Sequence, residues 1–226
     1  MGKYLADLQL WITNISEVLL LINTVLCAKY LLKVSQAFRV WTYFQLFTLL
    51  ILIVAKILWL EHEHNKSINN LPLLHFYTFV EFVLLTLFYH QVFNEIPVWR
   101  KFIVTFSALV IGLILANSIF LQPITVFNTY SKTLTQVIFI FYAVIFFSQS
   151  MHNRAQVFYP AIKIINSAIL LYYAGSLFIF MFSNVFFQLD EFHRIFWVAN
   201  ALLYLIFQLL VFTAIWQFRQ MKSTYS

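Results

Sequence analysis

Seven long runs of apolar residues, each about as long as a bilayer is thick, dominate this chain of 226 residues. They cover approximately residues 10–32, 41–60, 71–92, 102–121, 129–149, 161–182 and 196–218. A helix of about 20 apolar residues crosses the roughly 30 Å hydrocarbon layer of a membrane. The strands of a membrane barrel would alternate apolar and polar residues over about ten positions, whereas these runs are apolar on every side. We therefore predict an all-α fold of seven transmembrane helices.

The composition excludes a soluble domain. Hydrophobic residues make up 62% of the chain and charged residues 10%, whereas soluble domains have about 45–50% apolar and about 25% charged residues. The net charge is +6, but the basic residues occur in ones and twos and form no stripe that could follow a phosphate backbone. The expected partner is the lipid bilayer, and no nucleic acid is expected.

Short polar segments separate the apolar runs, and none is long enough to divide the chain into domains. Pro97, Pro123 and Pro160 fall in these breaks, and Pro72 lies in the first turn of the third run, where proline fits well. The N-terminal residues lack the basic start and the cleavage site of a signal peptide. We expect a single bundle over residues 1–226, with the first run retained as a helix.

Lysine and arginine are distributed unevenly between the two sets of helix flanks. The larger set is Lys29, Lys33, Arg39, Arg100, Lys101, Arg154, Lys163, Arg219 and Lys222. The smaller set is Lys3, Lys66, Lys132 and Arg194. Loops rich in lysine and arginine stay in the cytoplasm. This predicts a multi-pass protein of a cell's inner (cytoplasmic) membrane, with the N-terminus outside and the C-terminus cytoplasmic.

Four charged side chains interrupt the apolar runs. Glu17 and Glu81 lie near the middle of the first and third runs, and Lys56 and Lys132 lie nearer the outer ends of the second and fifth. A charge at the bilayer centre costs roughly 2.5–3.5 kcal/mol, so these groups need partners, water or a shared proton. We predict an outward-facing polar pocket in which the carboxylates face Lys56 or Lys132. The alternatives are an ion-pair network that only fixes helix packing, and, for Lys132, extension to the headgroups.

Uncharged polar residues extend this predicted pocket. His75 and Thr78 share one face of the third helix, and Asn14 lies three residues before Glu17. Asn117 and Asn128 add polar atoms in the same half of the membrane. The predicted ligand-binding residues are Glu81, Glu17, Lys56, His75, Thr78, Asn14, Lys132 and Asn200.

The segment EHEH, residues 61–64, is the closest approach to a metal motif. Imidazole and carboxylate bind transition metals, and a structural zinc site needs four ligands. In an extended chain His62 and His64 would point the same way, but on a helix they would lie about 200° apart. We prefer a solvated loop that caps the second helix, with His62 and His64 as the weaker metal-binding alternative.

Several catalytic and cofactor signatures are missing. The chain contains neither the HExxH zinc motif nor the GxSxG nucleophile motif. The last apolar run has no lysine, so a retinal Schiff base is not expected. We predict no other cofactor. The chain has 3 glycines, whereas transporters depend on broken helices and close helix crossings. No motif calls for an enzyme, and the low glycine content argues against a transporter.

Three stretches together resemble a family of uncharacterised bacterial seven-helix membrane proteins, some of which precede histidine kinases. They are YTFVEFVLLTLFY (77–89), AQVFYPAIKIINSAILLYYAGSLFIFMFSN (155–184) and FWVANALLYLIFQLLVFTAIW (196–216). The resemblance implies a sensory or ligand-binding bundle. After the last helix only RQMKSTYS follows, which is too short for a kinase, so a signal would have to leave through a partner protein.

The residues and the resemblance together favour a receptor-like bundle. A small amphipathic ligand would enter from the outer leaflet and engage Glu81, with Glu17 and Lys56 completing the site. The first alternative is a small proton-coupled transporter in which Glu81 alternates between protonated and ionised forms. The further alternatives are an intramembrane lipid-modifying enzyme and a scaffold subunit of a larger complex.

Overall fold

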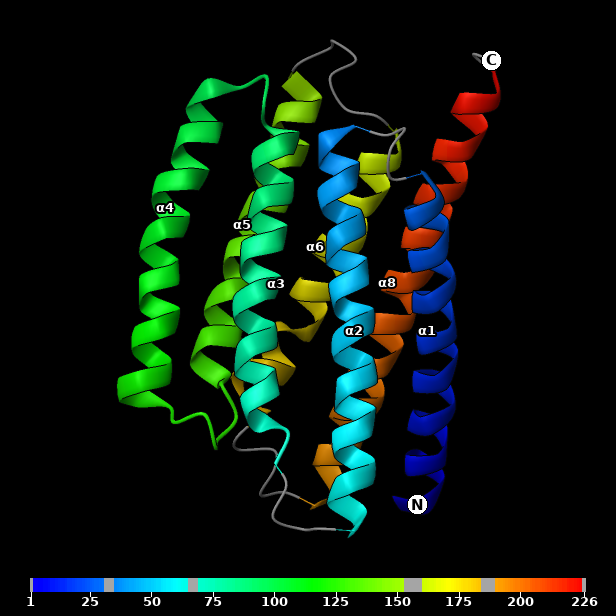
Figure 1. Cartoon of the computed structure of the whole chain (residues 1–226), viewed down its shortest axis with the longest axis vertical. Helices are drawn as coiled ribbons and strands as arrows, with labels where there is room; N and C mark the ends of the chain where they lie inside the picture. Colours follow the sequence, from blue (N-terminus) through cyan, green and yellow to red (C-terminus); the bar gives the residue numbers. More distant parts are fainter. Residues whose placement is uncertain (1, 31–34, 65–68, 153–159, 184–189, 225–226) are drawn as a thin grey trace. The chain divides into compact units, whose positions relative to one another are not determined.

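The computed structural model describes residues 2–30, 35–64, 69–152, 160–183 and 190–224. These residues form helices joined by short connections, and no strand occurs among them (Figure 1). The helices are α1 (Gly2–Tyr30), α2 (Gln36–His64), α3 (Leu71–Val92), α4 (Pro97–Ala116), the π-helical turn η2 (Asn117–Leu121), α5 (Thr129–His152), α6 (Pro160–Met181) and α8 (Asp190–Thr224).

Seven of these helices are long and apolar enough to cross a membrane. They run through the seven apolar runs of the sequence, with η2 continuing the fourth span to Leu121. The prediction of an all-α, multi-pass membrane protein is therefore confirmed. Which side of the membrane each terminus faces stays a prediction.

The helices extend further than the apolar runs indicated. Helix α1 begins at Gly2 rather than near residue 10, and α8 covers residues 190–224 rather than 196–218. An apolar run marks only the part inside the hydrocarbon, whereas the backbone hydrogen bonds continue into the polar flanks. Pro97 and Pro160, which we placed in the breaks, are the first residues of α4 and α6, because an N–H at the first helical position has no intrahelical partner to lose.

The contacts divide the chain into two compact units. The central unit is residues 30–135, and the terminal unit is residues 1–29 and 136–226. Helix α5 contributes its first turns to the central unit and the rest to the terminal unit.

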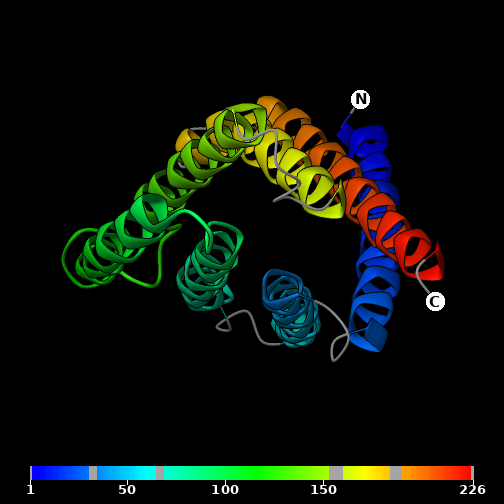
Figure 2. The same ribbon diagram turned by 90° about the horizontal axis from the view of Figure 1, so that it is seen from above.

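In the central unit, α3 packs against both α2 and α4 (Figure 2). Large aromatic side chains fill the contact between α2 and α3. The fully buried Trp41 of α2 lies 5.5 Å from Phe88 of α3, measured between ring centroids. Phe47 and Tyr77 stack with their ring planes 5° apart. Such aromatic pairs contribute about 0.5–1.5 kcal/mol beyond the area that they bury, and they fix α2 against the helix that carries Glu81.

In the terminal unit, α6 packs along α8, and α1 packs on α8 through Ile12, Val198 and Ala201. The α6–α8 contact is closest at Gly175. A Cβ atom built there would lie 2.8 Å from Cδ2 of Leu203. The absence of a side chain at Gly175 therefore makes room for Leu203, as small residues do at helix contacts in membranes.

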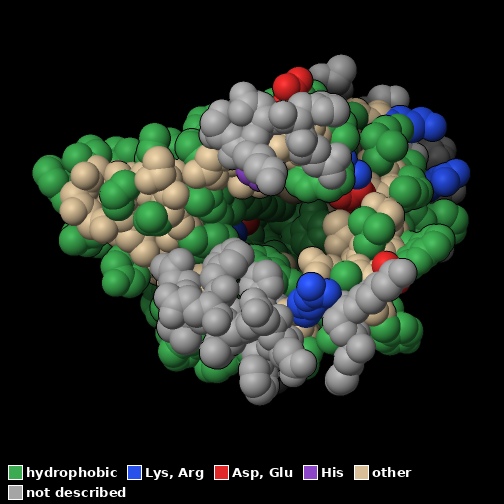
Figure 3. Space-filling view, turned by 90° about the horizontal axis from the view of Figure 1, so that it is seen from below, with side chains coloured by type: hydrophobic (Ala, Val, Ile, Leu, Met, Phe, Trp, Pro, Cys, Tyr) green, Lys and Arg blue, Asp and Glu red, His purple; other side chains and the backbone are tan. Residues whose placement is uncertain are grey.

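Apolar side chains also cover the outside of the helices. On α1 the exposed residues Trp11, Ile15, Val18, Ile22 and Val25 follow one face at helical spacing. Outside the grey atoms, the end view in Figure 3 is mainly hydrophobic and uncharged surface with few charged side chains. Soluble proteins rarely expose so large an apolar surface, and lipid is the solvent that suits it.

The two membrane-spanning glycines give a matched test of the α6–α8 contact. We expect Gly175→Val to lower the free energy of unfolding by about 1–3 kcal/mol more than Gly112→Val, because overpacking a well-filled contact costs that much. Both substitutions place a β-branched residue in a helix, but nothing lies within 4 Å of a Cβ atom at Gly112. Thermal unfolding in detergent measures the difference. Leu203→Ala should recover part of the loss, and equal destabilisation by the two valines would contradict the packing.

Candidate functional site

A buried ion pair lies at the centre of the polar groups in the central unit. The Lys132 Nζ of α5 lies 2.6 Å from the Glu81 Oε2 of α3, and the two side chains are 3% and 1% exposed. The same Nζ lies 5.1 Å from the ring centroid of Tyr77, where the face of an aromatic ring attracts a cation. Tyr77 and Glu81 are four residues apart and share a face of α3, so one helix face presents both groups to Lys132.

The start of α5 is held on α3 one turn away from the ion pair. Asn128, the residue before α5, donates through Nδ2 to Thr78 Oγ1 at 2.7 Å and to the Leu74 carbonyl at 3.3 Å. The Lys132 amide donates to the Asn128 carbonyl at 3.0 Å. Thr78 precedes Glu81 by three residues and Asn128 precedes Lys132 by four, which is one helical turn on each helix. The Asn128–Thr78 contact therefore sets the register that brings Lys132 to Glu81.

Burial makes the stability of the protein depend strongly on this pair. Charges moved out of water lose several kcal/mol of solvation each, and their mutual attraction repays this only with good geometry and further contacts. Both residues make additional interactions. As a pair they are formally neutral. Removal of either partner would leave an uncompensated charge in an apolar interior.

His75 ties α3 to the connection between α4 and α5. Its side chain is buried, Nε2 lies 3.0 Å from the Val126 carbonyl oxygen, and Nδ1 lies 3.1 Å from Ser118 Oγ. A carbonyl oxygen only accepts, so the Nε2 atom carries a hydrogen and donates it. One imidazole thus contacts both η2 and the segment that leads into α5.

Asn117 connects η2 to the first turn of α5. Its Nδ2 donates to Ser131 Oγ at 2.9 Å and to Gln122 Oε1 at 3.2 Å. Gln122 Oε1 also accepts from the Tyr130 amide at 3.0 Å, and the Gln122 amide donates to the Asn117 carbonyl at 2.8 Å. π-Helical turns of this kind are often found at functional sites. The polar cluster, as we call it, comprises His75, Thr78, Glu81, Asn117, Ser118, Asn128, Ser131 and Lys132.

Two amide oxygens of the polar cluster have unused capacity. Asn117 Oδ1 and Asn128 Oδ1 are buried and accept no hydrogen bond from any described residue. An unsatisfied buried polar group costs about 1–3 kcal/mol, and a native protein normally meets this cost with a water molecule or a ligand. Both orphaned atoms are acceptors. The cluster can therefore take up a hydrogen-bond donor without losing a bond that it already has.

Four of the predicted site residues come together in the central unit. Glu81, Lys132, Thr78 and His75 all belong to the polar cluster, and the expected pairing of Glu81 with Lys132 is present. The Lys132 ammonium is buried in this pair, so its alternative extension to the headgroups is wrong. Lys56 is exposed on α2. Ligand binding by any of these residues stays a prediction.

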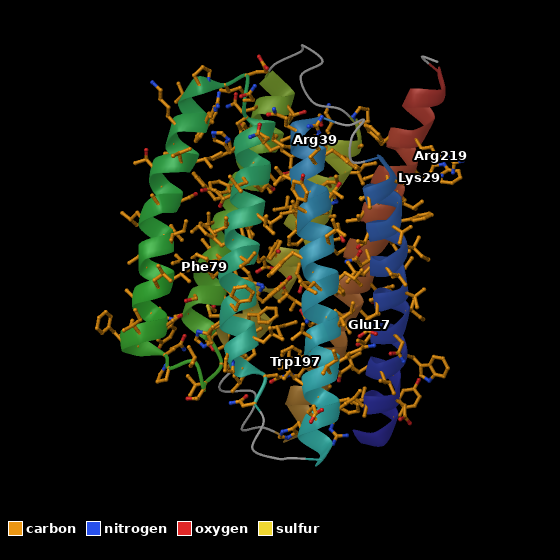
Figure 4. The ribbon with its side chains drawn as sticks, viewed as in Figure 1. Glu17, Lys29, Arg39, Phe79, Trp197 and Arg219 are labelled. Carbon is orange, nitrogen blue, oxygen red and sulfur yellow. The ribbon has the colours of Figure 1, made fainter. Side chains whose placement is uncertain are left out.

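The other predicted site residues belong to the terminal unit. Asn14 is exposed on α1, and Glu17 is half-buried on the same helix (Figure 4). Asn200 of α8 is half-buried, and its Oδ1 accepts no hydrogen bond within the described part of the chain. The participation of Asn14, Glu17 and Asn200 in a site with Glu81 stays a prediction.

Four members of the polar cluster were not among the predicted ligand-binding residues: Asn117, Asn128, Ser118 and Ser131. One signal was available, because Asn128 directly precedes a helix and asparagine favours the N-cap position. No pattern in the sequence marks Ser118 or Ser131. Their roles depend on where the connection between α4 and α5 lies against α3, which only the folded chain decides.

Polar contacts also join the helices of the terminal unit. Asn23 of α1 donates through Nδ2 to both the side-chain and the backbone oxygen of Gln208 on α8, each at 2.9 Å. Gln136 of α5 donates to Ser176 Oγ of α6 at 2.9 Å. All four side chains are fully buried. These contacts are typical of the amide and hydroxyl pairs that hold membrane helices together, and we assign them a structural role.

Basic side chains lie at the helix ends. In the terminal unit, Lys29 of α1 and Arg219 of α8 lie at the same end (Figure 4), and the Arg219 guanidinium lies 5.6 Å from the Trp216 ring centroid. In the central unit, Arg100 donates through Nε to His90 Nε2 at 3.0 Å. Aromatic and basic residues of this kind are typical of the membrane–water interface.

The EHEH segment is helical rather than a loop. Helix α2 continues through His64, so the loop that we preferred there is wrong. A shared ion at His62 and His64 stays a prediction. Among the described residues, no group of three or more His, Cys, Asp or Glu side chains could hold a metal ion. The His64 side chain lies outside the described residues.

Comparisons with protein-family models, with curated proteins and with solved structures found no match for this chain. The resemblance to bacterial seven-helix proteins stays a prediction. The site must therefore be interpreted from its own geometry.

The ion pair predicts a characteristic double-mutant result. We expect Glu81→Gln and Lys132→Met each to lower the free energy of unfolding by about 3–5 kcal/mol, because each leaves one buried charge without its partner. The double variant should be more stable than either single variant, since it buries no charge. Chemical or thermal unfolding of the four proteins in one detergent measures this coupling. Additive losses would show that Glu81 and Lys132 do not stabilise each other.

Proposed function

We propose that this protein is a membrane-embedded ligand-binding and sensory bundle, and that the Glu81–Lys132 pair is its recognition element. The observation that supports it best is the burial of a complete ion pair in a membrane helix bundle. Ionisable residues inside a membrane are costly and usually serve a function. The unused acceptors of Asn117 and Asn128 support a site that takes up a further polar group.

The charges define the class of ligand. A ligand that removed only one partner would leave the other charge alone in an apolar interior, which is strongly unfavourable. A head group that both donates and accepts hydrogen bonds can replace Lys132 at Glu81 and Glu81 at Lys132 together. The aromatic side chains of α2 and α3 suit an apolar body. The proposed ligand is therefore a small amphipathic molecule with a zwitterionic or mixed donor–acceptor head group.

Two arrangements of the pair provide the switch. In the closed arrangement Lys132 is bonded to Glu81, as in this structure. In the open arrangement both groups bond the ligand, and α3 and α5 separate at this point. A ligand shifts such an equilibrium by its difference in affinity for the two arrangements. We propose that a partner protein senses the shift of α3 and α5 and carries the signal onwards.

The proposed location follows from the basic residues. The excess of lysine and arginine at one set of helix ends supports an inner-membrane protein with its N-terminus outside. In this orientation the N-terminal end of α3, with His75 and Thr78, faces the outer leaflet. The ligand would reach the pair from that side.

A small proton-coupled carrier is the second candidate. The observation in its favour is the direct contact between Lys132 Nζ and Glu81 Oε2. Transfer of one proton from Lys132 to Glu81 would neutralise both side chains, and the pair could then open without burying a charge. Vesicles containing the protein would then take up protons after an acid pulse, and Glu81→Gln would abolish the uptake. A binding and sensory bundle would show no such uptake.

Native mass spectrometry of the protein purified in mild detergent tests the proposed function. We expect a defined additional mass on the wild-type protein, lost from Glu81→Gln and from Lys132→Met, because each variant removes one half of the recognition element. Glu61→Gln is the control, since Glu61 is an exposed carboxylate on α2. Identical spectra for all four proteins, with lower stability of the two site variants, would make the pair a structural strut and contradict the proposal.

A further inference from the structure

His75 and Ser118 make three short polar contacts, but with a neutral imidazole they have only two hydrogens to donate. The Ser118 hydroxyl lies 3.1 Å from the Ile114 carbonyl oxygen and 3.1 Å from His75 Nδ1. It has a single hydrogen to donate. His75 Nε2 donates to the Val126 carbonyl. The Ser118 hydroxyl can therefore donate either to His75 Nδ1 or to the Ile114 carbonyl. The protonation of Nδ1 decides which of the two it is.

The same heavy-atom positions suit two protonation states of His75. With neutral imidazole, Ser118 donates to Nδ1, and the Ile114 carbonyl loses that bond. With imidazolium, Nδ1 donates to Ser118 Oγ, Ser118 donates to the Ile114 carbonyl, and Nε2 still donates to Val126. The charged state makes all three contacts, and the charge-assisted bonds from the imidazolium offset part of the cost of burying its charge. Proton binding therefore tightens the attachment of α3 to the α4–α5 connection.

Among the described residues of the central unit, few titratable groups lie near this histidine. On α3 itself the nearest along the helix are Tyr77 and Glu81, and on the first turns of α5 they are Tyr130 and Lys132. The part of α2 that shares this end of the central unit carries Lys56, Glu61 and His62. Residues 102–128, which include most of α4, η2 and the connection, contain no titratable side chain. Within this set, His75 is the histidine whose ring contacts both η2 and the α4–α5 connection.

A short series of bonds leads from His75 to the ion pair. Ser118 follows Asn117 in the chain, and Asn117 Nδ2 donates to Ser131 Oγ at 2.9 Å. Ser131 precedes Lys132 in the first turns of α5, and Lys132 bonds Glu81. A change at Ser118 therefore reaches Lys132 through one side-chain hydrogen bond and two peptide links.

We propose that His75 is a proton-binding site that regulates the Glu81–Lys132 site. Proton uptake locks η2 and the start of α5 onto α3 and holds the ion pair closed, and proton release loosens this attachment. The regulatory meaning rests on the proposed function of the pair, but the proton binding and the change in attachment can be measured without any ligand.

Nitroxide labels at two exposed positions test the proposal in the full chain in lipid nanodiscs. Ile124→Cys reports on the connection and Tyr130→Cys on the first turn of α5; both side chains are exposed, whereas the native Cys27 is buried. We expect both labels to lose mobility when the pH falls from about 8 to about 5, the range over which a histidine in water changes its charge. His75→Gln and Ser118→Ala should abolish the response. His62→Gln, which alters an exposed histidine of α2, should retain it.

Nitrogen-15 NMR of labelled histidine measures the protonation of His75 in the wild-type protein, and a variant is needed only to assign the signal. The His75 signal, assigned by its loss in His75→Gln, should change from singly to doubly protonated over the same pH range. A signal that stays constant would overturn the proposal. A response at Ile124 without one at Tyr130 would also overturn it, because the change would not reach α5.

Glu81→Gln separates this inference from the proposed function. We expect the label at Ile124 in this variant still to lose mobility as the pH falls, because His75, Ser118 and Asn117 are intact. Loss of the bound mass in Glu81→Gln tests ligand recognition alone. A pH response without any bound mass would therefore support proton binding and contradict the proposed ligand site. A bound mass without a pH response would support the ligand site and contradict proton binding at His75.

Discussion

The lack of water inside a membrane is the constraint on which this structure depends. Every polar group placed in the hydrocarbon layer must find its partner within the protein. The backbone meets this demand by forming helices over each apolar run. The side chains meet it in a few concentrated places, above all where Lys132 reaches Glu81. Elsewhere, the exposed surface of the described spans carries mainly apolar residues, which need no polar contact.

The polar cluster of the central unit shows how one costly group requires others. A carboxylate in α3 needs a cation, and Lys132 reaches it only because Asn128 fixes the first turn of α5 on Thr78. Asn117 of η2 holds this first turn of α5 through Ser131. His75 holds η2 through Ser118. The connection between α4 and α5 is thus part of the site. A change in any of these bonds alters the environment of the ion pair, which is a suitable basis for a sensory element.

Much of the fold could be predicted because apolar runs report directly on membrane helices. The helix ends could not, since the backbone continues its hydrogen bonds into polar flanks, and the EHEH segment extended α2 instead of forming a loop. Part of the candidate site was also predictable: a carboxylate at the middle of an apolar run needs a cation, and Lys132 was one of two suitable lysines. The spacing of residues along α2, α3 or α5 does not show that Glu81 pairs with Lys132 rather than with Lys56.

The sequence by itself determined the class of this protein, because length and apolarity alone decide whether a helix can span a bilayer. It also determined that Glu81 would need a partner, because an isolated charge is too costly there. Only the tertiary structure decided that the partner is Lys132, that Asn128 and Asn117 position it, and that His75 contacts both Ser118 and Val126. Most of these contacts join residues 43 to 51 positions apart, whereas Asn117 and Ser131 are 14 apart. They depend on how the helices and their connections pack, and no local sequence pattern shows this.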